Sequence, residues 1–379
     1  MVDQNIIRAD GGYAALDEYL SRTGAKRVLL VCGNSIRHLK INAYFETLPQ
    51  RLGVEVVRFS DYQPNPRYES VVSGVELLRR EGCDSIIAVG GGSGMDVAKC
   101  IKLYSNMDPG ENYLKQTIVP NALPLLAVPT TAGTGSEATR FAVIYYGGEK
   151  QSVTHDSCIP QTVLFDASTL ASLPLFQKKC AMLDALCHAV EAFWSVHSTP
   201  QSQDYSRGAI RLILDNMAGY LAGDHARDAA MLEAANLGGK AINITQTTAG
   251  HAMCYKLTGL YGIPHGFAAA LCVRRLWPFM LAHPEKCVDP RGEGYLAGMF
   301  EDLAKAMDCD DARQAADRFD AIVASLALPT PKLRDESELE RLSGSVNPVR
   351  LKNNPVALDA GSIRALYQSI LRGSEEADA

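Results

Sequence analysis

Residues 85–99 read SIIAVGGGSGMDVAK, and this stretch decides the fold of the first half of the chain. An apolar run of β-formers at 85–89 leads directly into a glycine turn at 90–94, and helix-forming residues follow. Backbone N–H groups and the helix dipole both face such a turn, so it can hold a phosphate group. The pattern therefore predicts phosphate binding at 90–94. A tight strand-to-helix turn without a ligand is the alternative.

The glycine spacing does not match two better-known nucleotide motifs. It is not G-x-G-x-x-G, and no Lys-[Ser/Thr] pair follows at P-loop spacing. A second loop, PTTAGTGSE at 129–137, follows the apolar run 125–128 and is rich in hydroxyl groups and glycine. An ordinary polar turn is the alternative for this loop. Because ligands of open α/β sheets bind at the carboxyl ends of strands, two such loops favour a nucleotide site.

The rest of the first half alternates strand-like runs with helical spacing, which predicts a parallel sheet with helices on its faces. From about residue 175, long helical patterns replace the strands. We therefore expect an α/β domain over 1–174 and an all-α domain over 175–379. The predicted strands are 27–32, 53–59, 85–89, 125–128, 141–146 and 162–165, and the long helices are 178–196, 201–221, 224–244 and 297–326.

Candidate metal ligands lie in the helical half. Asp184 and His188 are four residues apart in a helical pattern and share one face. His251 and His265 follow in TAGHAMCYKLTG and GIPHG. One carboxylate and three imidazoles can hold Fe(II) or Zn(II), and Glu191, on the face of Asp184, is a candidate hydrogen-bond partner for a ligand. Spacing alone leaves open that each histidine is structural.

Composition narrows the class of protein. The 379 residues are 47% hydrophobic and 21% charged, as in globular proteins, with a net charge of −6. A net negative charge does not indicate the basic surface that binds nucleic acid. No apolar run approaches the roughly 18 residues that a membrane span needs. Ten scattered cysteines without a C-x-x-C pair predict reduced thiols, and the N-terminus lacks a secretory pattern. We expect a cytoplasmic protein that binds neither nucleic acid nor membrane.

Four ordered motifs resemble the iron-containing (group III) alcohol dehydrogenase family. They are GGGSGMDVAK at 90–99, PTTAGTGSE at 129–137, DALCHAVEA at 184–192 and the HAM…PHG stretch at 251–266. The resemblance spans essentially the whole chain. It implies a Rossmann-like N-terminal domain and a helical C-terminal domain, an architecture shared with dehydroquinate synthase, and an active site in the cleft between them. It also implies a homodimer.

The resemblance assigns roles residue by residue. It implies that iron or zinc is bound by Asp184, His188, His251 and His265. It implies that the cofactor is bound by Gly91, Gly92, Ser93 and Asp96 at the pyrophosphate, by Thr130, Thr131 and Thr134 in the second loop, and by Lys150 near the nicotinamide ribose.

Two positions depart from the family pattern. Many members carry a histidine for proton relay four residues after the third ligand, where this chain has Tyr255. A phenol, with a pKa near 10, is a poorer shuttle, and water or the cofactor ribose are alternatives. NAD-preferring members often have an aspartate after the first strand. Here Gly33 and Asn34 follow Cys32, with Arg37 close behind. Without the aspartate, the 2′-phosphate of NADPH is not repelled, so either NADH or NADPH can be the cofactor.

The activity implied is metal-dependent reduction of a small aldehyde to a primary alcohol by NAD(P)H. Arg140 stands where many members have an uncharged residue, and we expect it to anchor an anionic substrate, with a surface salt bridge as the alternative. Residues 139–156, 177–198 and 345–356 look most like phosphonoacetaldehyde reductases, which form 2-hydroxyethylphosphonate in phosphonate biosynthesis. Alternatives are a general alcohol dehydrogenase or aldehyde reductase for neutral substrates, a metal- and NAD-dependent lyase, and a non-catalytic nucleotide sensor.

Overall fold

The computed structural model describes residues 4–372, which divide into two compact units. The first unit runs to Pro174 and includes Ala222–Asn236, and the second comprises Leu175–Leu221 and the chain from Leu237. The assignment of cofactor binding to 1–174 and of metal binding to 175–379 stays a prediction.

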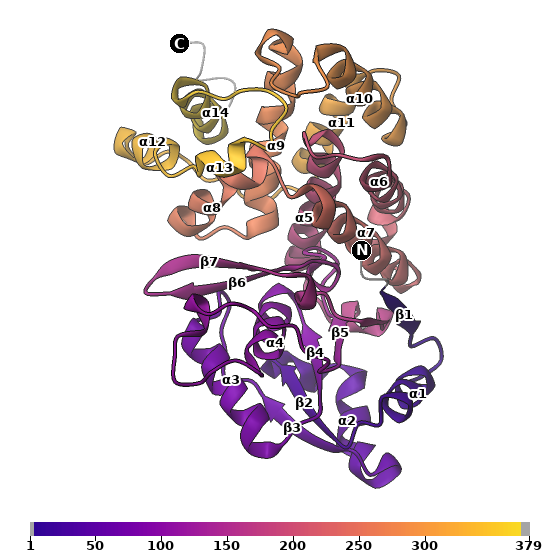
Figure 1. The fold of residues 1–379 in the computed structure, drawn as a ribbon. Coiled ribbons are helices and arrows are strands. Elements are labelled where there is room, and N and C mark those ends of the chain that lie inside the picture. Colours follow the sequence, from indigo (N-terminus) through magenta and orange to yellow (C-terminus); the bar gives the residue numbers. More distant parts are fainter. Residues whose placement is uncertain (1–3, 373–379) are drawn as a thin grey trace. The chain divides into compact units, whose positions relative to one another are not determined.

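The first unit is built on a six-stranded parallel sheet in the order β1-β8-β5-β4-β2-β3 (Figure 1). Strands β2 and β4 are buried, apolar runs, as expected where helices cover both faces of a parallel sheet. The predicted Rossmann-like fold is confirmed. The strands are β1 (Asn5–Arg8), β2 (Arg27–Cys32), β3 (Glu55–Phe59), β4 (Ser85–Gly90), β5 (Leu125–Pro129) and β8 (Thr162–Phe165), and the long helices of this part are α1 (Ala14–Thr23), α2 (Lys40–Leu52), α3 (Tyr68–Glu81) and α4 (Gly92–Tyr104).

The strand order reverses direction at β2. The chain places β3 on one side of β2 and then re-enters the sheet on the other side as β4. This is the switch point at which open parallel sheets bind ligands, beyond the carboxyl ends of the strands. The segments that leave β2, β4 and β5 begin with Gly33, Gly91 and Thr130. The sheet therefore brings the predicted cofactor loops to one edge.

One predicted strand does not belong to this sheet. Residues Phe141–Tyr146 (β6) pair antiparallel with Glu149–Thr154 (β7) in a separate two-stranded sheet. The connecting Gly147 and Gly148 have φ of 60° and 81°, the backbone that a two-residue hairpin turn requires. The sequence missed β7 because EKQSVT is mostly polar, and missed β1 because NIIR is short.

The second unit is helical, and α5 (Leu175–Trp194) is its most buried long helix. Helix α5 packs against α6 (Pro200–Leu221) and α9 (His265–Ala282), and α8 (Ala249–Tyr261) packs on α9. The buried polar residues of α5 include Asp184, His188 and Glu191. The other helices of this unit are α10 (Glu293–Ala306), α11 (Ala312–Ser325), α12 (Glu336–Ser343), α13 (Pro348–Leu351) and α14 (Ala360–Arg372), and α7 (Asp228–Thr245) belongs to it from Leu237 onward.

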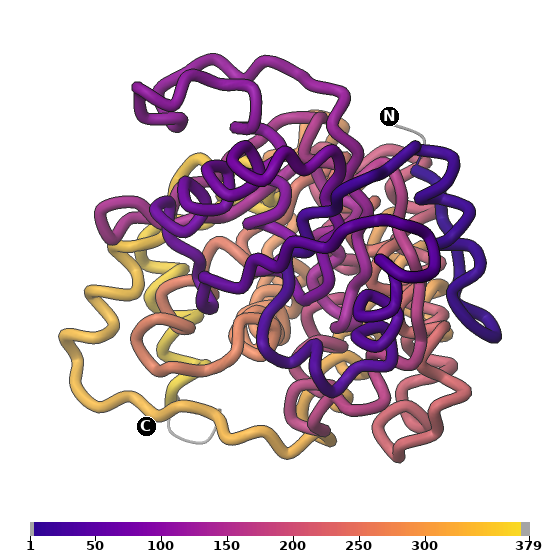
Figure 2. Tube along the Cα trace, turned by 90° about the horizontal axis from the view of Figure 1, so that it is seen from below, coloured from indigo at the N-terminus to yellow at the C-terminus, as the bar shows by residue number. Residues whose placement is uncertain are grey.

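The prediction of one helix over 297–326 is wrong, because two helices, α10 and α11, cover this range. Asp308 between them has a φ of 50°, which ends the helical path. Asp311 then caps α11, its side chain accepting a hydrogen bond from the backbone N–H of Gln314 at 2.8 Å. Beyond α11, residues 327–335 run without helix or strand toward α12 (Figure 2).

The structure also bears on the predictions about thiols and membrane spans. All ten cysteines are free thiols. Among residues 4–372, no helix combines the length and apolar character that crossing a bilayer requires.

Candidate metal centre and cofactor loops

The four predicted ligands come from three helices of the second unit. Helix α5 carries Asp184 and His188, one turn apart, α8 carries His251, and α9 begins at His265. The side chains of Asp184, His188 and His251 are nearly inaccessible to solvent, whereas that of His265 is 37% exposed. The site is therefore buried on the side of α5 and open at His265.

One carboxylate oxygen lies at the centre of this group. Asp184 Oδ1 is 3.9 Å from His188 Nε2, 3.5 Å from His251 Nε2 and 3.9 Å from His265 Nε2. Ligand atoms of a tetrahedral ion at about 2.0–2.1 Å lie about 3.3–3.4 Å apart, so the observed spacing is close to that of a bound ion. The ligand atoms of Asp184, His188 and His251 lie within 4.8 Å of one another.

Two buried atoms also indicate that these residues bind a metal ion. Asp184 Oδ1 and His251 Nε2 have no hydrogen-bond partner within the described part of the chain. Such atoms are rare in protein interiors, since desolvation without a partner is costly. The residues present therefore fit a divalent metal. Three imidazoles and a carboxylate suit iron or zinc.

Glu191 orients His251 from behind. Its Oε1 accepts hydrogen bonds from Thr248 N at 3.0 Å, Thr248 Oγ1 at 2.7 Å and His251 N at 3.2 Å, and its Oε2 pairs with His251 Nδ1. This contact directs Nε2 of the ring toward Asp184. Such carboxylate–histidine pairs are typical of metal sites, where they fix the ring and its tautomer.

The pKa values of Asp184 and Glu191 favour their negatively charged forms, which suit the binding of a cation. Burial alone would raise the pKa of Asp184, but the histidines around it hold that pKa well below its ordinary range. Burial lowers the pKa of His251, yet Glu191 and Asp184 outweigh this effect and raise it to about 9. The pKa of Glu191 is lowered, because His251 and Thr248 outweigh its burial. Both carboxylates are therefore favoured in the charged form.

Two glycines let the helices approach closely enough to form the site. A Cβ on Gly266 would lie 2.2 Å from the backbone oxygen of Cys180 and 2.6 Å from Asp184 Cβ. A Cβ on Gly250 would lie 2.6 Å from Val273 Cγ2 and 3.0 Å from Glu191 Oε1. No side chain fits at Gly266, because the obstacle there is backbone. Sequence reasoning did not identify either glycine as part of the site.

Tyr255, the predicted catalytic residue, lies against a ligand. Its ring stacks on that of His265, with centroids 5.4 Å apart and planes 25° apart. Its hydroxyl accepts a hydrogen bond from Arg350 Nη1 at 2.9 Å. Burial raises the pKa of Tyr255 well above its ordinary value. Cys254 Sγ, next in the chain to Tyr255, is 3.4 Å from His265 Nδ1.

The predicted cofactor loops meet in the first unit. A Cβ on Gly91 would lie 3.3 Å from Thr131 Oγ1, and one on Gly92 would lie 3.1 Å from Thr134 Cγ2. The first N–H groups of α4 have no partner within the helix, so they are available to a phosphate group. Tyr62, which sequence reasoning did not select, adds a hydroxyl that a Cβ on Gly94 would meet at 2.8 Å.

A buried lysine joins the two loops. Lys99 Nζ donates hydrogen bonds to Ser136 Oγ at 2.9 Å, Thr139 Oγ1 at 3.1 Å and Phe141 O at 2.8 Å. Ser136 Oγ in turn donates to Asp96 Oδ1 at 3.0 Å. Burial lowers the pKa of Lys99, and Asp96 partly offsets that effect. Asp96 is thus tied to the second loop, a role that its sequence position did not predict.

The remaining predicted residues lie at other places in the first unit. Gly33 precedes a short 3-10 helix, Asn34–His38, in which Asn34 is exposed. Lys150 lies on β7; burial raises the pKa of Asp96 in the first loop, and the charge of Lys150 offsets a part of that effect. Arg140 is half-buried, 3.8 Å from Asp156 Oδ1 and over the ring of Phe141.

The sequence was compared with known proteins and solved structures. Residues 3–167 match the family described as iron-containing alcohol dehydrogenase, and residues 179–371 match its C-terminal family. The chain belongs to the iron-containing alcohol dehydrogenase family. This confirms the resemblance in the sequence and the predicted enzyme class, an NAD-dependent, metal-containing alcohol dehydrogenase.

The similar proteins within this family are named for different substrates. Alcohol dehydrogenase 4 of Schizosaccharomyces pombe is 30% identical over 95% of this chain and 86% of its own length. Phosphonoacetaldehyde reductase of Streptomyces viridochromogenes is 32% identical over 79% of each chain. A solved 1,3-propanediol oxidoreductase is 27% identical, with a TM-score of 0.85 over 98% of this chain and 100% of that one.

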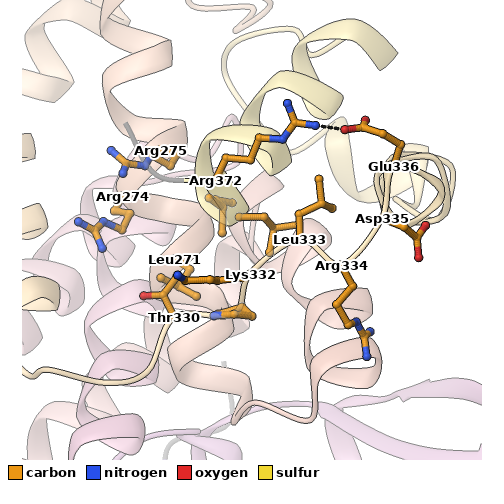
Figure 3. Close-up of a pocket in the computed structure, with 13 residues that line it drawn as sticks. Leu271, Arg274, Arg275, Thr330, Lys332, Leu333, Arg334, Asp335, Glu336 and Arg372 are labelled. Atoms are coloured by element: carbon orange, nitrogen blue, oxygen red, sulfur yellow. Dashed lines mark ion pairs between the residues drawn. The ribbon is translucent and has the colours of Figure 1, made fainter. Parts of the chain in front are cut away.

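This alcohol dehydrogenase also has a basic cavity away from the candidate metal centre. Its volume is about 640 Å³, and Arg274, Arg275, Lys332, Arg334 and Arg372 are among its lining residues (Figure 3). Arg274 and Arg275 lie nine and ten residues beyond His265 on α9, roughly 14 Å along the axis. Acidic residues neutralise much of the charge, since Arg372 pairs with Glu336, Arg274 with Asp320 and Arg334 with Glu338.

We expect Gly266→Ala to damage the metal centre. The added methyl would overlap the Cys180 carbonyl, so α9 must shift away from Asp184 and carry His265 with it. Overpacking of this kind costs about 1–3 kcal/mol of unfolding free energy. Metal content after reconstitution and the denaturation midpoint measure the effect.

The control for that variant is Gly259→Ala on α8. No atom lies within 4 Å of a Cβ at Gly259, and this substitution should stabilise the helix by about 0.5–1 kcal/mol while metal content stays unchanged. Equal metal content in the two variants would contradict the close-approach argument.

We expect Lys99→Met to weaken the cofactor site. The substitution leaves Ser136 Oγ, Thr139 Oγ1 and a carbonyl without their buried donor, at a cost of about 2–3 kcal/mol of unfolding free energy. Dinucleotide titration should show weaker binding, because the two loops lose their connection. Lys26→Met, at an exposed lysine, serves as the control and should change neither quantity.

Proposed function

We propose that this enzyme reduces small aldehydes to primary alcohols with NADH or NADPH at a site built on iron or zinc. The balanced reaction is aldehyde, NAD(P)H and a proton giving alcohol and NAD(P)⁺. The observation that carries the proposal is the convergence of three imidazole nitrogens on Asp184 Oδ1 at 3.5–3.9 Å. Membership of the alcohol dehydrogenase family supports it.

In this proposal, residues of the second unit would bind the metal, and loops of the first unit would bind the cofactor. When bound, the metal polarises a carbonyl oxygen and the reduced nicotinamide supplies a hydride. Asp184, His188, His251 and His265 would hold the metal, and Glu191 keeps the His251 ring in its ligating orientation. The glycine turn with Gly91 and Gly92 would hold the pyrophosphate, and the threonine loop would hold the ribose side.

In this proposal Tyr255 forms a hydrogen bond at the site and does not relay the proton. Its ring stacks on His265 and its hydroxyl contacts Arg350, so it lies between a ligand and a cation. A phenol is a weak proton shuttle at neutral pH compared with imidazole. Solvent or the cofactor ribose then supplies the proton that completes the alcohol.

For the substrate itself, we propose phosphonoacetaldehyde. The similarity to a phosphonoacetaldehyde reductase, 32% identical over 79% of the chain, supports this choice. Arg140 is the cation that the sequence offers for the phosphonate. A neutral alcohol or aldehyde is the second candidate, and the similarity to alcohol dehydrogenase 4 over 95% of the chain favours it.

Metal removal tests the proposal directly. Chelation should abolish aldehyde-dependent oxidation of NADH or NADPH, and added Fe(II) or Zn(II) should restore it. Asp184→Asn should lower metal affinity by at least about 100-fold, since losing an outer partner of a ligand already costs 10–100-fold. Asp204→Asn, at an exposed carboxylate paired with Arg207, should behave as wild type. Full activity in the chelated protein would refute the proposal.

The anchor role of Arg140 gives a separate prediction. If its guanidinium contacts the phosphonate, Arg140→Ala should raise KM for phosphonoacetaldehyde by about tenfold or more, the size of a lost hydrogen bond to a charged group. KM for propanal should stay unchanged. Equal effects on both aldehydes would refute the anchor role and leave Arg140 with a structural role, such as its ion pair with Asp156.

A further inference from the structure

The second unit has its own cation beside the candidate metal centre. The Arg350 guanidinium carbon lies 4.9 Å from the centroid of the Tyr255 ring, and Nη1 donates a hydrogen bond to the Tyr255 hydroxyl at 2.9 Å. The same ring stacks on His265. Two contacts therefore connect the guanidinium to a predicted metal ligand, although Arg350 is 95 residues from Tyr255 in the sequence.

The charge of Arg350 is not balanced by an acidic side chain. Arg350 is half-buried, and within residues 4–372 no carboxylate forms an ion pair with it. Of the other half-buried arginines of this unit, Arg275 also forms no ion pair within residues 4–372, whereas two others have acidic partners. Arg274 contacts Asp320 at 2.8 Å, and Arg291 contacts Asp289 at 2.6 Å. A cation withdrawn from water without an anion loses solvation, so an anionic ligand would be favoured at Arg350.

The backbone around Arg350 is held in place. Asn347 caps the N-terminus of helix α13, and its Oδ1 accepts a hydrogen bond from Val349 N at 2.9 Å. Just beyond the helix, Asn353 Nδ2 donates to Thr247 O at 3.1 Å. Thr247 lies four residues before the predicted ligand His251. The backbone that carries Arg350 is therefore connected to the segment that precedes His251.

We propose that Arg350 binds the anionic group of the substrate, and that the substrates are small aldehydes with a phosphonate or sulfonate one methylene from the carbonyl. The inference rests on the proposed function, because it names the substrate class of that reaction. A guanidinium matches such oxyanions with two parallel hydrogen bonds. Tyr255 is a positioning residue, since its ring and hydroxyl hold the guanidinium beside His265.

The experiment compares three aldehydes on metal-reconstituted enzyme: phosphonoacetaldehyde, sulfoacetaldehyde and propanal. Arg350→Ala should lower kcat/KM for the anionic substrates by about 10- to 100-fold, the effect of losing hydrogen bonds to a charged group, and leave propanal unchanged. Arg350→Lys keeps the charge and should recover part of the loss. Arg341→Ala, at an exposed arginine on α12, is the control and should match wild type.

A binding measurement separates substrate contact from an effect on folding. Calorimetric titration with 2-hydroxyethylphosphonate, in the presence of oxidised cofactor, should show tight binding to wild type and a 10- to 100-fold weaker affinity for Arg350→Ala. Metal content and the thermal midpoint should be the same in both proteins. The two oxyanion aldehydes also show whether phosphonate or sulfonate is preferred.

Three results would contradict this inference, and they differ in what else they contradict. Equal losses on propanal and the anionic aldehydes would make Arg350 a structural support for Tyr255. A wild-type enzyme without preference for the anionic aldehydes would refute the substrate class but leave aldehyde reduction intact. A wild-type enzyme that reduces none of the three would refute the proposed function itself.

Discussion

The carboxylate of Asp184 is the constraint on which the second unit depends. A charged carboxylate inside a helical core is tolerated only where cations or hydrogen-bond donors surround it, and here three imidazoles do so. Those imidazoles come from three helices, so α5, α8 and α9 must approach one another closely at this level. Gly250 and Gly266 remove the side chains that would keep them apart, and Glu191 orients the deepest ring.

Much of the candidate site could be predicted because its signals are local or belong to motifs. Asp184 and His188 share a face through the helical period, and Glu191 follows on that same face. The glycine turn at 90–94 was recognisable because a buried strand and a helix flank it directly. The family pattern then supplied His251 and His265, which spacing alone could not connect to α5.

What could not be predicted depends on tertiary contacts. Nothing in the local sequence shows that the Gly266 Cβ position faces the Cys180 carbonyl, or that Arg350 meets Tyr255 across 95 residues. Lys99 reads as an ordinary position on an amphipathic helix, yet it is fully buried and bonded to the second loop. The strand β7 was missed because its alternation is polar, and the break between α10 and α11 because the apolar spacing continues across it.

Arg350, the proposed substrate anchor, and the candidate metal ligands lie on different kinds of helix. The predicted ligands lie on long, buried helices, where a substitution disturbs the packing of the whole unit. Arg350 lies on a four-residue helix whose residues are not among the buried ones. Exchange of side chains in this segment leaves the core volume untouched. If Arg350 binds the substrate as proposed, substitutions in this short segment can change the preferred substrate without altering the helices that carry the candidate metal ligands.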